Sequence, residues 1–437
     1  MKISVFGLGY VGTVTAGFLA DAGHDVVCVD ISQTKIDLVK SSSSPIYENG
    51  MQDLISRGVA DGRLTATFDA RAALNDSELS FITVGTPAGD DRHVDTSYLK
   101  RICTKIGQVL ANKDGFHTFV VRCPVVPGTT DELVIPTIED ESGKKVFLDF
   151  DVCVNPHFMR VGSLVEDYRT PPLILIGQQD DRSGDRVAQL FDSSKTAVVR
   201  TSLRTAELVT YASDAFHALK VCFANEIGAL CKTLDIDSHE VMNILKLDEK
   251  LTISGAYLSP GLSFGGPALP SSIKTLVGKS EDEAVELPAI ASLLESNEEH
   301  RKRALSLIMK SGKKKIGLIG LAFKAGTDEV RNSPMLDIAA DLIDNDIEVM
   351  IYDSNVQLSK LMDSNKDYLE SKIMGAADLM AGSFDQLFNW ADVIVIGQAD
   401  EQFEYLVSLD TDKVIIDLVR ISEDLADSGG NYRGICW

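Results

Sequence analysis

The sequence predicts an α/β protein in which two Rossmann-like, doubly wound parallel-sheet domains are joined by a long central helical segment. Short apolar strands alternate with helical segments in the first part of the chain, and a long amphipathic stretch follows from about residue 201. A second alternating run begins at residue 313. Such alternation is typical of parallel sheets with crossover helices. We therefore expect three segments, at 1–200, 201–300 and 301–437.

The first segment opens with the pattern of a dinucleotide-binding turn. We expect a short apolar strand at 2–6, a glycine turn, a helix of small residues at 13–22 and a second strand at 25–29. The turn contains Gly7, Gly9 and Gly12, and the second strand ends on Asp30. Such glycines let a pyrophosphate approach a helix N-terminus, and an acid about 20 residues later can bind the adenosine ribose. The alternative is a glycine-rich turn without a ligand. The complete pattern favours NAD, and Asp30 favours it over NADP.

The remaining elements follow the same alternation. We expect further strands in the first segment at 79–84, 118–121 and 151–154, and a helix at 99–110. In the central segment, apolar residues recur every three or four positions over 205–228, which predicts a long helix with one buried face. In the third segment we expect strands at 313–320, 348–352, 392–397 and 414–419, and a helix at 335–345.

Two loops contain candidate binding or reactive positions. In the loop 261–274, paired glycines allow close approach of the backbone to a ligand, and flanking prolines fix the turn around Ala268. A pocket loop of this kind normally presents a reactive group, but Ala268 presents only a methyl group. In the loop 320–334, Lys324 and Arg331 could meet phosphates, although exposed loop charges are the alternative.

Composition limits the classes of function. The 437 residues carry a net charge of −23, which disfavours nucleic acid and anionic membranes as partners. No apolar run reaches the ~20 residues that a membrane-spanning helix needs. The seven cysteines are scattered without metal-binding spacing, so we expect a reduced, cytoplasmic protein without a metal.

Taken together, these motifs resemble those of the UDP-glucose/GDP-mannose dehydrogenase family over the whole chain. The resemblance is closest to the GDP-mannose 6-dehydrogenases of the alginate pathway and extends to the terminal Gly434-Ile-Cys-Trp437. The family oxidises a sugar C6 alcohol to a carboxylate with two NAD. A cysteine thiolate captures the aldehyde, and water hydrolyses the resulting thioester. The resemblance also implies a homodimer whose long helices pack together, a nucleotide-sugar ligand and a third segment that binds it.

The binding positions of the family are largely present. Those that the resemblance assigns to NAD are Gly7, Gly9, Tyr10, Val11, Gly12, Asp30, Lys35, Thr86 and Arg331. Those that it assigns to the nucleotide sugar are His217, Asn225, Tyr257, Gly265 and Lys324. Two further sugar positions differ, because Ala256 replaces an aromatic residue and Ser259 replaces an arginine.

The catalytic positions of the family are replaced throughout. The family's central loop has Gly-Gly-Ser-Cys-Leu-Pro-Lys-Asp, whereas this loop has Gly-Gly-Pro-Ala-Leu-Pro-Ser-Ser. Ala268 thus stands for the nucleophile, Ser271 for the lysine and Ser272 for the aspartate. The other replaced positions are Thr210 for the oxyanion lysine, Asp214 for its asparagine partner, Val161 for the catalytic glutamate, His157 for a second glutamate, and Cys123-Pro124 for the usual Ser-Thr.

Three functions are compatible with this pattern. The first is a silenced family member that binds NAD, binds nucleotide sugars weakly and regulates polysaccharide biosynthesis, alone or in a heteromer with an active paralogue. The second is an oxidoreductase of altered chemistry that uses His157 as a base, although a histidine tolerated in an emptied site is the alternative. The third is a working GDP-mannose dehydrogenase, which needs an unseen nucleophile. Ser271 and Ser272 have no base beside them in sequence.

Overall fold

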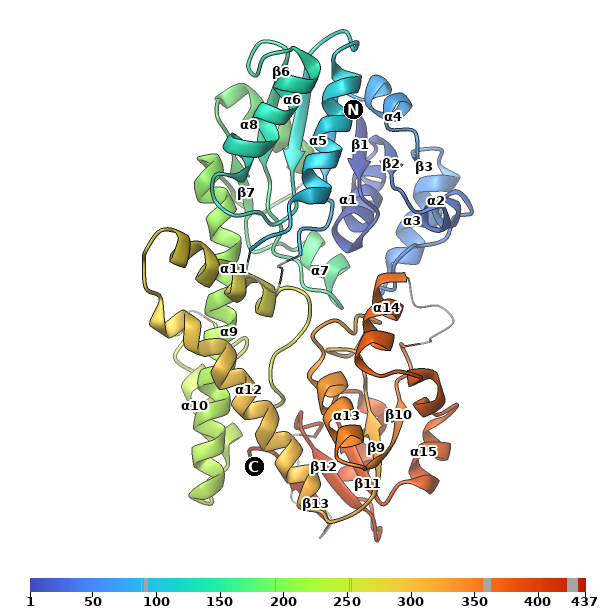
Figure 1. The fold of residues 1–437 in the computed structure, drawn as a ribbon, viewed down its shortest axis with the longest axis vertical. Helices are drawn as coiled ribbons and strands as arrows, with labels where there is room; N and C mark the ends of the chain where they lie inside the picture. The colour runs from blue at the N-terminus through green and yellow to red at the C-terminus, as the bar shows by residue number, and fades with distance from the viewer. Residues whose placement is uncertain are drawn as a thin grey trace. The chain divides into compact units, whose positions relative to one another are not determined.

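The computed structural model describes residues 1–437 except 88, 90–92, 193, 251, 253, 357–362 and 423–430. The chain divides into two compact units, Met1–Ser213 and Asp214–Trp437, and each contains its own sheet (Figure 1). The α/β class and the two Rossmann-like sheets predicted from the sequence are confirmed. The division into three segments stays a prediction.

The first unit contains an eight-stranded sheet in the order β3-β2-β1-β4-β5-β6-β7-β8. Its strands are β1 (Lys2–Phe6), β2 (Asp25–Val29), β3 (Leu64–Thr67), β4 (Leu79–Ile82), β5 (His117–Val121), β6 (Phe150–Val154), β7 (Ile174–Gly177) and β8 (Val198–Thr201). The strand order reverses direction between β1 and β4. Ligands of open parallel sheets bind at such a switch point, beyond the carboxyl ends of the strands.

The sheet departs from the expected parallel arrangement at one pairing. Strands β6 and β7 are antiparallel, whereas β7 and β8 are parallel to each other. The segment between β6 and β7 contains only the short helix α7 (Leu164–Arg169). The chain therefore re-enters the sheet in the reverse direction, and the residue pair that joins the two strands, Val154 with Gly177, consists of the last residue of each strand.

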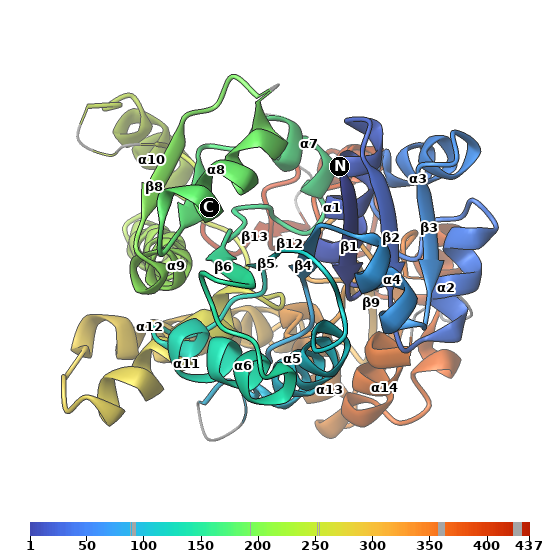
Figure 2. The same ribbon diagram turned by 90° about the horizontal axis from the view of Figure 1, so that it is seen from above.

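Helices cover both faces of this sheet. They are α1 (Tyr10–Asp21), α2 (Gln33–Lys40), α3 (Met51–Ala60), α4 (Ala70–Asp76), α5 (Ser97–Leu110), α6 (Ile135–Ser142) and α8 (Asp181–Ala188), with a short π-helix η1 (Thr130–Val134) and a short 3-10 helix η2 (Gln189–Phe191). One buried apolar cluster joins α1, α3 and α8 to the sheet, and another joins α4, α5 and α6 to it (Figure 2). Both faces are thus buried, as strands with continuous apolar runs require.

The helix predicted at 205–228 is the longest element, α9 (Leu203–Thr233), with 31 residues. Its first residues belong to the first unit and its remainder belongs to the second. Three shorter helices follow: α10 (Ser238–Lys246), α11 (Leu269–Asp282) and α12 (Pro288–Met309). Part of α9 packs with α11 and α12 around a small apolar cluster that includes Ala218 and Ile273. This packing places the loop 261–268 beside α9.

The second unit contains a five-stranded parallel sheet in the order β10-β9-β11-β12-β13. Its strands are β9 (Lys315–Ile319), β10 (Glu348–Tyr352), β11 (Val393–Ile396), β12 (Val414–Asp417) and β13 (Tyr432–Gly434). Its other elements are α13 (Pro334–Asp344), α14 (Asp363–Lys372), η3 (Ala376–Leu379), α15 (Phe384–Trp390) and η4 (Glu401–Val407).

The turn after β9 repeats the local geometry of the turn after β1. Gly320 has φ 92°, and the buried Asp353 at the end of β10 accepts hydrogen bonds from the backbone N–H groups of Leu321 and Ala322. Gln398 closes this second turn, because its Nε2 donates to Ala322 O at 2.8 Å and to Asp353 Oδ2 at 3.1 Å. A Cβ on Gly320 would lie 2.4 Å from Gln398 Cγ.

Candidate functional site

The glycine turn after β1 combines tight packing with one open position. Gly7 has φ 109°, and a Cβ there would lie 2.9 Å from Thr83 O. A Cβ on Gly12 would lie 1.8 Å from Gly7 O. Gly9, the N-cap of α1, has no described atom within 4 Å of its would-be Cβ. Gly7 and Gly12 are therefore required by the tight packing of the turn, whereas Gly9 leaves the N-terminus of α1 open to a ligand.

The surroundings of this turn fit a dinucleotide. Asp30 accepts hydrogen bonds from Leu8 N at 2.6 Å and from Ser32 N at 2.8 Å, which holds its carboxylate beside the turn. The first turn of α1 contains no acidic residue, so its partial positive charge stays available to a pyrophosphate. Lys35 adds a positive charge on the first turn of α2.

The other predicted NAD positions are placed in both units. Tyr10 and Val11 form the first turn of α1, and Thr86 donates to the carbonyl of Pro124 at 2.6 Å. Arg331 belongs to the second unit, where its guanidinium binds both carboxylate oxygens of the fully buried Glu329. The carboxylate of Glu329 therefore neutralises the positive charge of Arg331, which was expected to meet a phosphate.

His157 lies in the loop after β6 and is half-buried. Burial, and then the cation of Arg122, lower the pKa of His157 to about 3. Its Nδ1 has no hydrogen-bond partner among the described residues. The imidazole is therefore neutral near pH 7, and such a low pKa makes it a weak base. Val161, in the same loop, packs its side chain against the apolar core that contains α1.

Asp214 and Ser272 form a pair that the sequence did not reveal. Ser272 on α11 donates a hydrogen bond of 2.6 Å from its hydroxyl to Asp214 Oδ2 on α9. Burial raises the pKa of Asp214 to about 6, although the Ser272 hydroxyl opposes this shift. Thr210 lies one turn earlier on α9, and its enclosed hydroxyl has no hydrogen-bond partner among the described residues.

This pair predicts a pH-dependent stability. The folded protein retains a proton on Asp214 above the ordinary pKa of 3.8. Protonation of Asp214 therefore stabilises the folded state at pH 4, and this stabilisation is lost as pH rises through about 6. The full difference corresponds to about 3 kcal/mol as an upper bound. Asp214→Asn is expected to raise the melting temperature at about pH 7.5 and to change it little at about pH 4. The same shift at both pH values, or in the exposed Asp344→Asn control, would contradict this origin.

Ala268 is the N-cap of α11 and is exposed, with Pro270 in the first turn of the helix. A helix N-terminus stabilises a thiolate, because the partial positive charge of the helix lowers the pKa of a cysteine placed there. The backbone at position 268 thus suits a charged nucleophile, but the methyl group of Ala268 cannot use it. Ser271 on the same helix is half-buried.

The loop that leads to Ala268 is held by the protein itself. Asn225 Oδ1 accepts a hydrogen bond from Gly261 N at 3.0 Å, and His300 Nε2 lies 2.6 Å from Gly261 O. A Cβ on Gly265 would lie 2.3 Å from Asn332 O, and one on Gly266 would lie 2.7 Å from the Phe323 ring. The backbone at these two glycines therefore lies close to the protein's own loop 323–334. His300 was not predicted as part of this loop's support, because it belongs to no motif.

Two further predicted sugar positions contact each other. The rings of His217 and Tyr257 stack with centroids 4.7 Å apart, and Tyr257 has φ 65°. Ser259 is exposed and accepts a hydrogen bond from Lys246 Nζ at 2.7 Å. Lys324 is half-buried in the loop after β9, and Ala256 is exposed.

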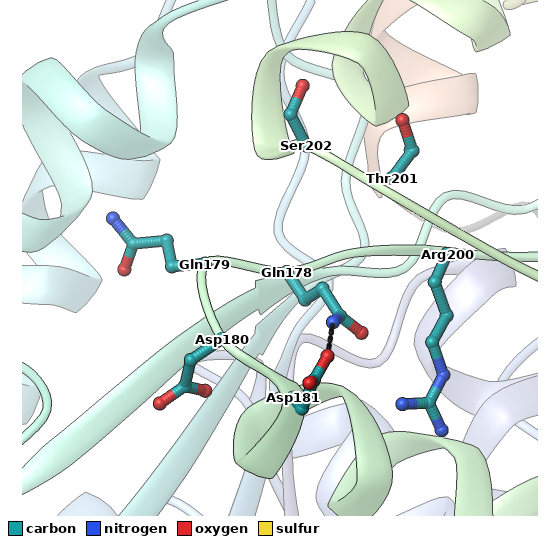
Figure 3. A pocket seen from close by; sticks show the side chains of 7 residues that line it. All are labelled: Gln178, Gln179, Asp180, Asp181, Arg200, Thr201 and Ser202. Carbon is teal, nitrogen blue, oxygen red and sulfur yellow. Dashed lines mark hydrogen bonds between the residues drawn. The ribbon is translucent and has the colours of Figure 1, made fainter.

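A shallow hollow in the first unit contains none of these positions. It is lined by Gln178, Gln179, Asp180, Asp181, Arg200, Thr201 and Ser202 (Figure 3). Gln178 Nε2 donates to Asp181 Oδ1 at 3.0 Å, and Arg200 pairs with Asp185 at 2.6 Å. The charged groups that line the hollow are thus bonded to the protein itself. The hollow lies beyond the carboxyl ends of β7 and β8, and none of its lining residues belongs to the glycine turn.

Within the described residues, no group of three or more His, Cys, Asp or Glu side chains is placed to hold a metal ion. No helix in the described part of the chain is long and apolar enough to cross a membrane.

Three family models match consecutive parts of the chain. The UDP-glucose/GDP-mannose dehydrogenase NAD binding domain matches residues 1–195, the central domain matches 204–299, and the UDP binding domain matches 317–424. GDP-mannose 6-dehydrogenase of Pseudomonas savastanoi pv. phaseolicola is 42% identical over 438 residues, which cover 100% of each chain. UDP-glucose 6-dehydrogenase AglM of Haloferax volcanii is 33% identical over 96% of this chain and 97% of that protein.

Solved structures with the same fold include dehydrogenases of two sugar nucleotides. A UDP-glucose dehydrogenase from Pyrobaculum islandicum has a TM-score of 0.90 and 30% identity, over 100% of this chain and 97% of that one. A GDP-mannose dehydrogenase from Pseudomonas aeruginosa, solved as a ternary complex, has a TM-score of 0.58 and 41% identity over 100% of both chains.

Proposed function

Because the chain belongs to the UDP-glucose/GDP-mannose dehydrogenase family, whose members are NAD-dependent nucleotide-sugar 6-dehydrogenases, we propose that it is a member silenced for the four-electron oxidation. The observation that carries this proposal is Ala268 at the N-terminus of α11, where the family resemblance requires the nucleophilic cysteine. NAD, when bound, accepts hydride. A methyl group cannot form the covalent adduct from which a second hydride would leave.

The other replacements support the same conclusion. Thr210 offers no positive charge for an oxyanion, and Val161 lies against apolar core, where it cannot activate water. Asp214 accepts a hydrogen bond from Ser272, and its carboxylate, when ionised, has no N–H with which to reproduce the donor of the family's asparagine. We expect such a protein to act in the cytoplasm by binding nucleotides or an active paralogue, and so to regulate polysaccharide biosynthesis. NADH production and uronate release, measured with NAD and GDP-mannose or UDP-glucose, test the silencing.

One observation favours a second candidate, a two-electron oxidoreductase. Oxidation of an alcohol to an aldehyde needs no covalent intermediate, but it needs a base for the hydroxyl proton while hydride passes to NAD. His157 is a poor candidate for this base because of its low pKa, whereas Asp214, with a pKa of about 6, is ionised near neutral pH. This candidate predicts one NADH per sugar and its loss in Asp214→Asn, whereas the silenced protein yields none.

We also propose that the protein is a homodimer formed through α9. Large apolar side chains are exposed along one face of this helix at spacings of three, four and seven residues: Phe216, Leu219, Phe223 and Leu230. Such spacing makes a continuous stripe on a helix surface. A stripe of this length is costly to leave in water, and a second copy of α9 can cover it.

Phe223→Glu is expected to convert the dimer to monomer at micromolar concentration, because it places a charge within the apolar stripe. Dimer affinity is expected to fall by at least ~10²-fold, since burying an unpaired charge costs several kcal/mol. Light scattering after size-exclusion chromatography measures the mass. Met374→Glu changes an exposed apolar residue away from α9 and is expected to remain dimeric. A monomeric wild type, or an unaltered Phe223→Glu dimer, would refute the proposal.

A further inference from the structure

Asp214 is an acidic side chain that has no cationic partner. It lies on α9, is half-buried, and accepts on Oδ2 the hydrogen bond of 2.6 Å from the Ser272 hydroxyl on α11. Its other oxygen, Oδ1, accepts no hydrogen bond from the described residues, and no described Lys, Arg or His pairs with the carboxylate. One side of the carboxylate is therefore open to a ligand.

This carboxylate is charged at neutral pH although its surroundings favour the neutral form. Burial raises the pKa of Asp214 to about 6, and the Ser272 hydroxyl opposes only part of that shift. At pH 7.5 the group is therefore ionised while it is partly removed from water. A charge in such a place is stabilised when a group of opposite sign is bound beside it. The described residues do not supply that group.

The same face of α11 carries a second polar group without a partner. Thr275 lies three residues after Ser272, so the two side chains project from one face of the helix. Thr275 is only 2% exposed, and its hydroxyl has no hydrogen-bond partner among the described residues. Carboxylate and hydroxyl oxygens both accept hydrogen bonds, and an ammonium group offers three N–H donors. This surface therefore suits an ammonium group in both charge and hydrogen bonding.

We infer that Asp214 and Ser272 form a binding site for a primary ammonium group on the sugar of a nucleotide sugar. This inference rests on the proposed function, because the family resemblance places Asp214 at a position that acts beside the C6 oxygen of the sugar. The ammonium group is therefore assigned to C6. Asp214 accepts its N–H groups, and Ser272 holds the carboxylate in place. The site thus favours a C6 ammonium group over the C6 hydroxyl that the family oxidises.

Titration calorimetry of the full chain at pH 7.5, without NAD, compares GDP-mannose with GDP-6-amino-6-deoxymannose. Wild type is expected to bind the amino compound about 10- to 100-fold more tightly, the range for one charge-assisted hydrogen bond. Asp214→Asn retains the shape of the side chain without its charge and is expected to bind the two compounds within about threefold of each other. Ser272→Ala keeps the carboxylate but frees it, and is expected to show a smaller preference than wild type.

Asp344→Asn is the matched control, because Asp344 is an exposed acid at the end of α13, and this variant is expected to keep the full preference. Asp214→Asn is expected to be at least as stable as wild type at pH 7.5, so unfolding cannot explain its loss of preference. The assignment is overturned if wild type does not prefer the amino compound, or if Asp214→Asn keeps the preference.

Two further measurements separate this assignment from its alternatives. Replacing sodium chloride with potassium chloride in the buffer is expected to leave the preference unchanged. Its loss would show that the site takes a metal cation, which also overturns the assignment. Because the titrations contain no NAD, they do not depend on turnover. Two NADH per GDP-mannose in a separate assay would refute the silencing, whereas only the comparison of the two compounds decides the ammonium site.

Discussion

With NAD and either GDP-mannose or UDP-glucose, the wild-type protein is expected to release no uronate and to accumulate no more than background NADH. Ala268→Cys is expected to leave this result unchanged. A cysteine at the N-terminus of α11 would ionise readily, so the missing elements are then the oxyanion charge and the base that activates water. Groups that act as a unit are not additive, so a single repair recovers little.

The informative comparison uses a fully repaired variant with Thr210→Lys, Asp214→Asn, Val161→Glu, Ala268→Cys, Ser271→Lys and Ser272→Asp. NADH absorbance is expected to rise at least ~10³-fold above that of the single cysteine variant. Because Asp214 and Ser272 are bonded to each other, their two changes have to be made together. Ser272→Asp alone would place two carboxylates in contact and serves as the control for stability. Sustained production of two NADH per sugar by wild type would refute the silencing.

GDP-mannose is expected to bind about 10²- to 10⁴-fold more weakly than to an active relative. Charge-assisted hydrogen bonds contribute ~1.5–3 kcal/mol each, and two of them are lost at Thr210 and Ser259, while Ala256 loses an aromatic contact. The Ser259 hydroxyl already accepts a hydrogen bond from Lys246, which supports the expected loss of sugar-nucleotide binding at this position.

Titration calorimetry with GDP-mannose and GDP measures this loss. Ser259→Arg combined with Thr210→Lys is expected to recover at least tenfold for the sugar nucleotide. Ser259→Ala, which adds no charge, is expected to bind GDP-mannose like wild type. Low-micromolar affinity of the wild type for GDP-mannose would show that other residues have rebuilt the pocket.

The fold was predictable from the sequence where a buried strand coincides with a short run of apolar residues. β1, β2 and β10 begin and end at the predicted residues, because each is a short apolar run bounded by polar residues or glycine. β3 (Leu64–Thr67) was missed, since its alternating buried and exposed residues on an edge strand resemble a loop. β7 (Ile174–Gly177) and β8 (Val198–Thr201) were missed as well; each has only four residues, and β8 is largely exposed.

The candidate site was predictable as a set of positions but not as a set of contacts. The glycine turn and Asp30 are local in sequence, so their spacing alone indicates their geometry. The bond between Asp214 and Ser272 joins residues 58 positions apart, and no pattern along the chain connects them. The pairing of Arg331 with Glu329 was equally hidden, although the two are close in sequence, because burial of Glu329 depends on the packing around it.

The turn after β9 has the same local design as the turn after β1, but its surroundings differ. Both sheets have a glycine with positive φ after their first strand and an aspartate at the end of the next. After β1 the position of Gly9 is open, but after β9 the corresponding backbone carries the side chain of Ala322 and is covered by the amide of Gln398. A glutamine amide of the protein thus binds the turn after β9, whereas the turn after β1 leaves space beside Gly9. Of these two described turns, the one after β1 alone leaves room for the phosphates of a dinucleotide.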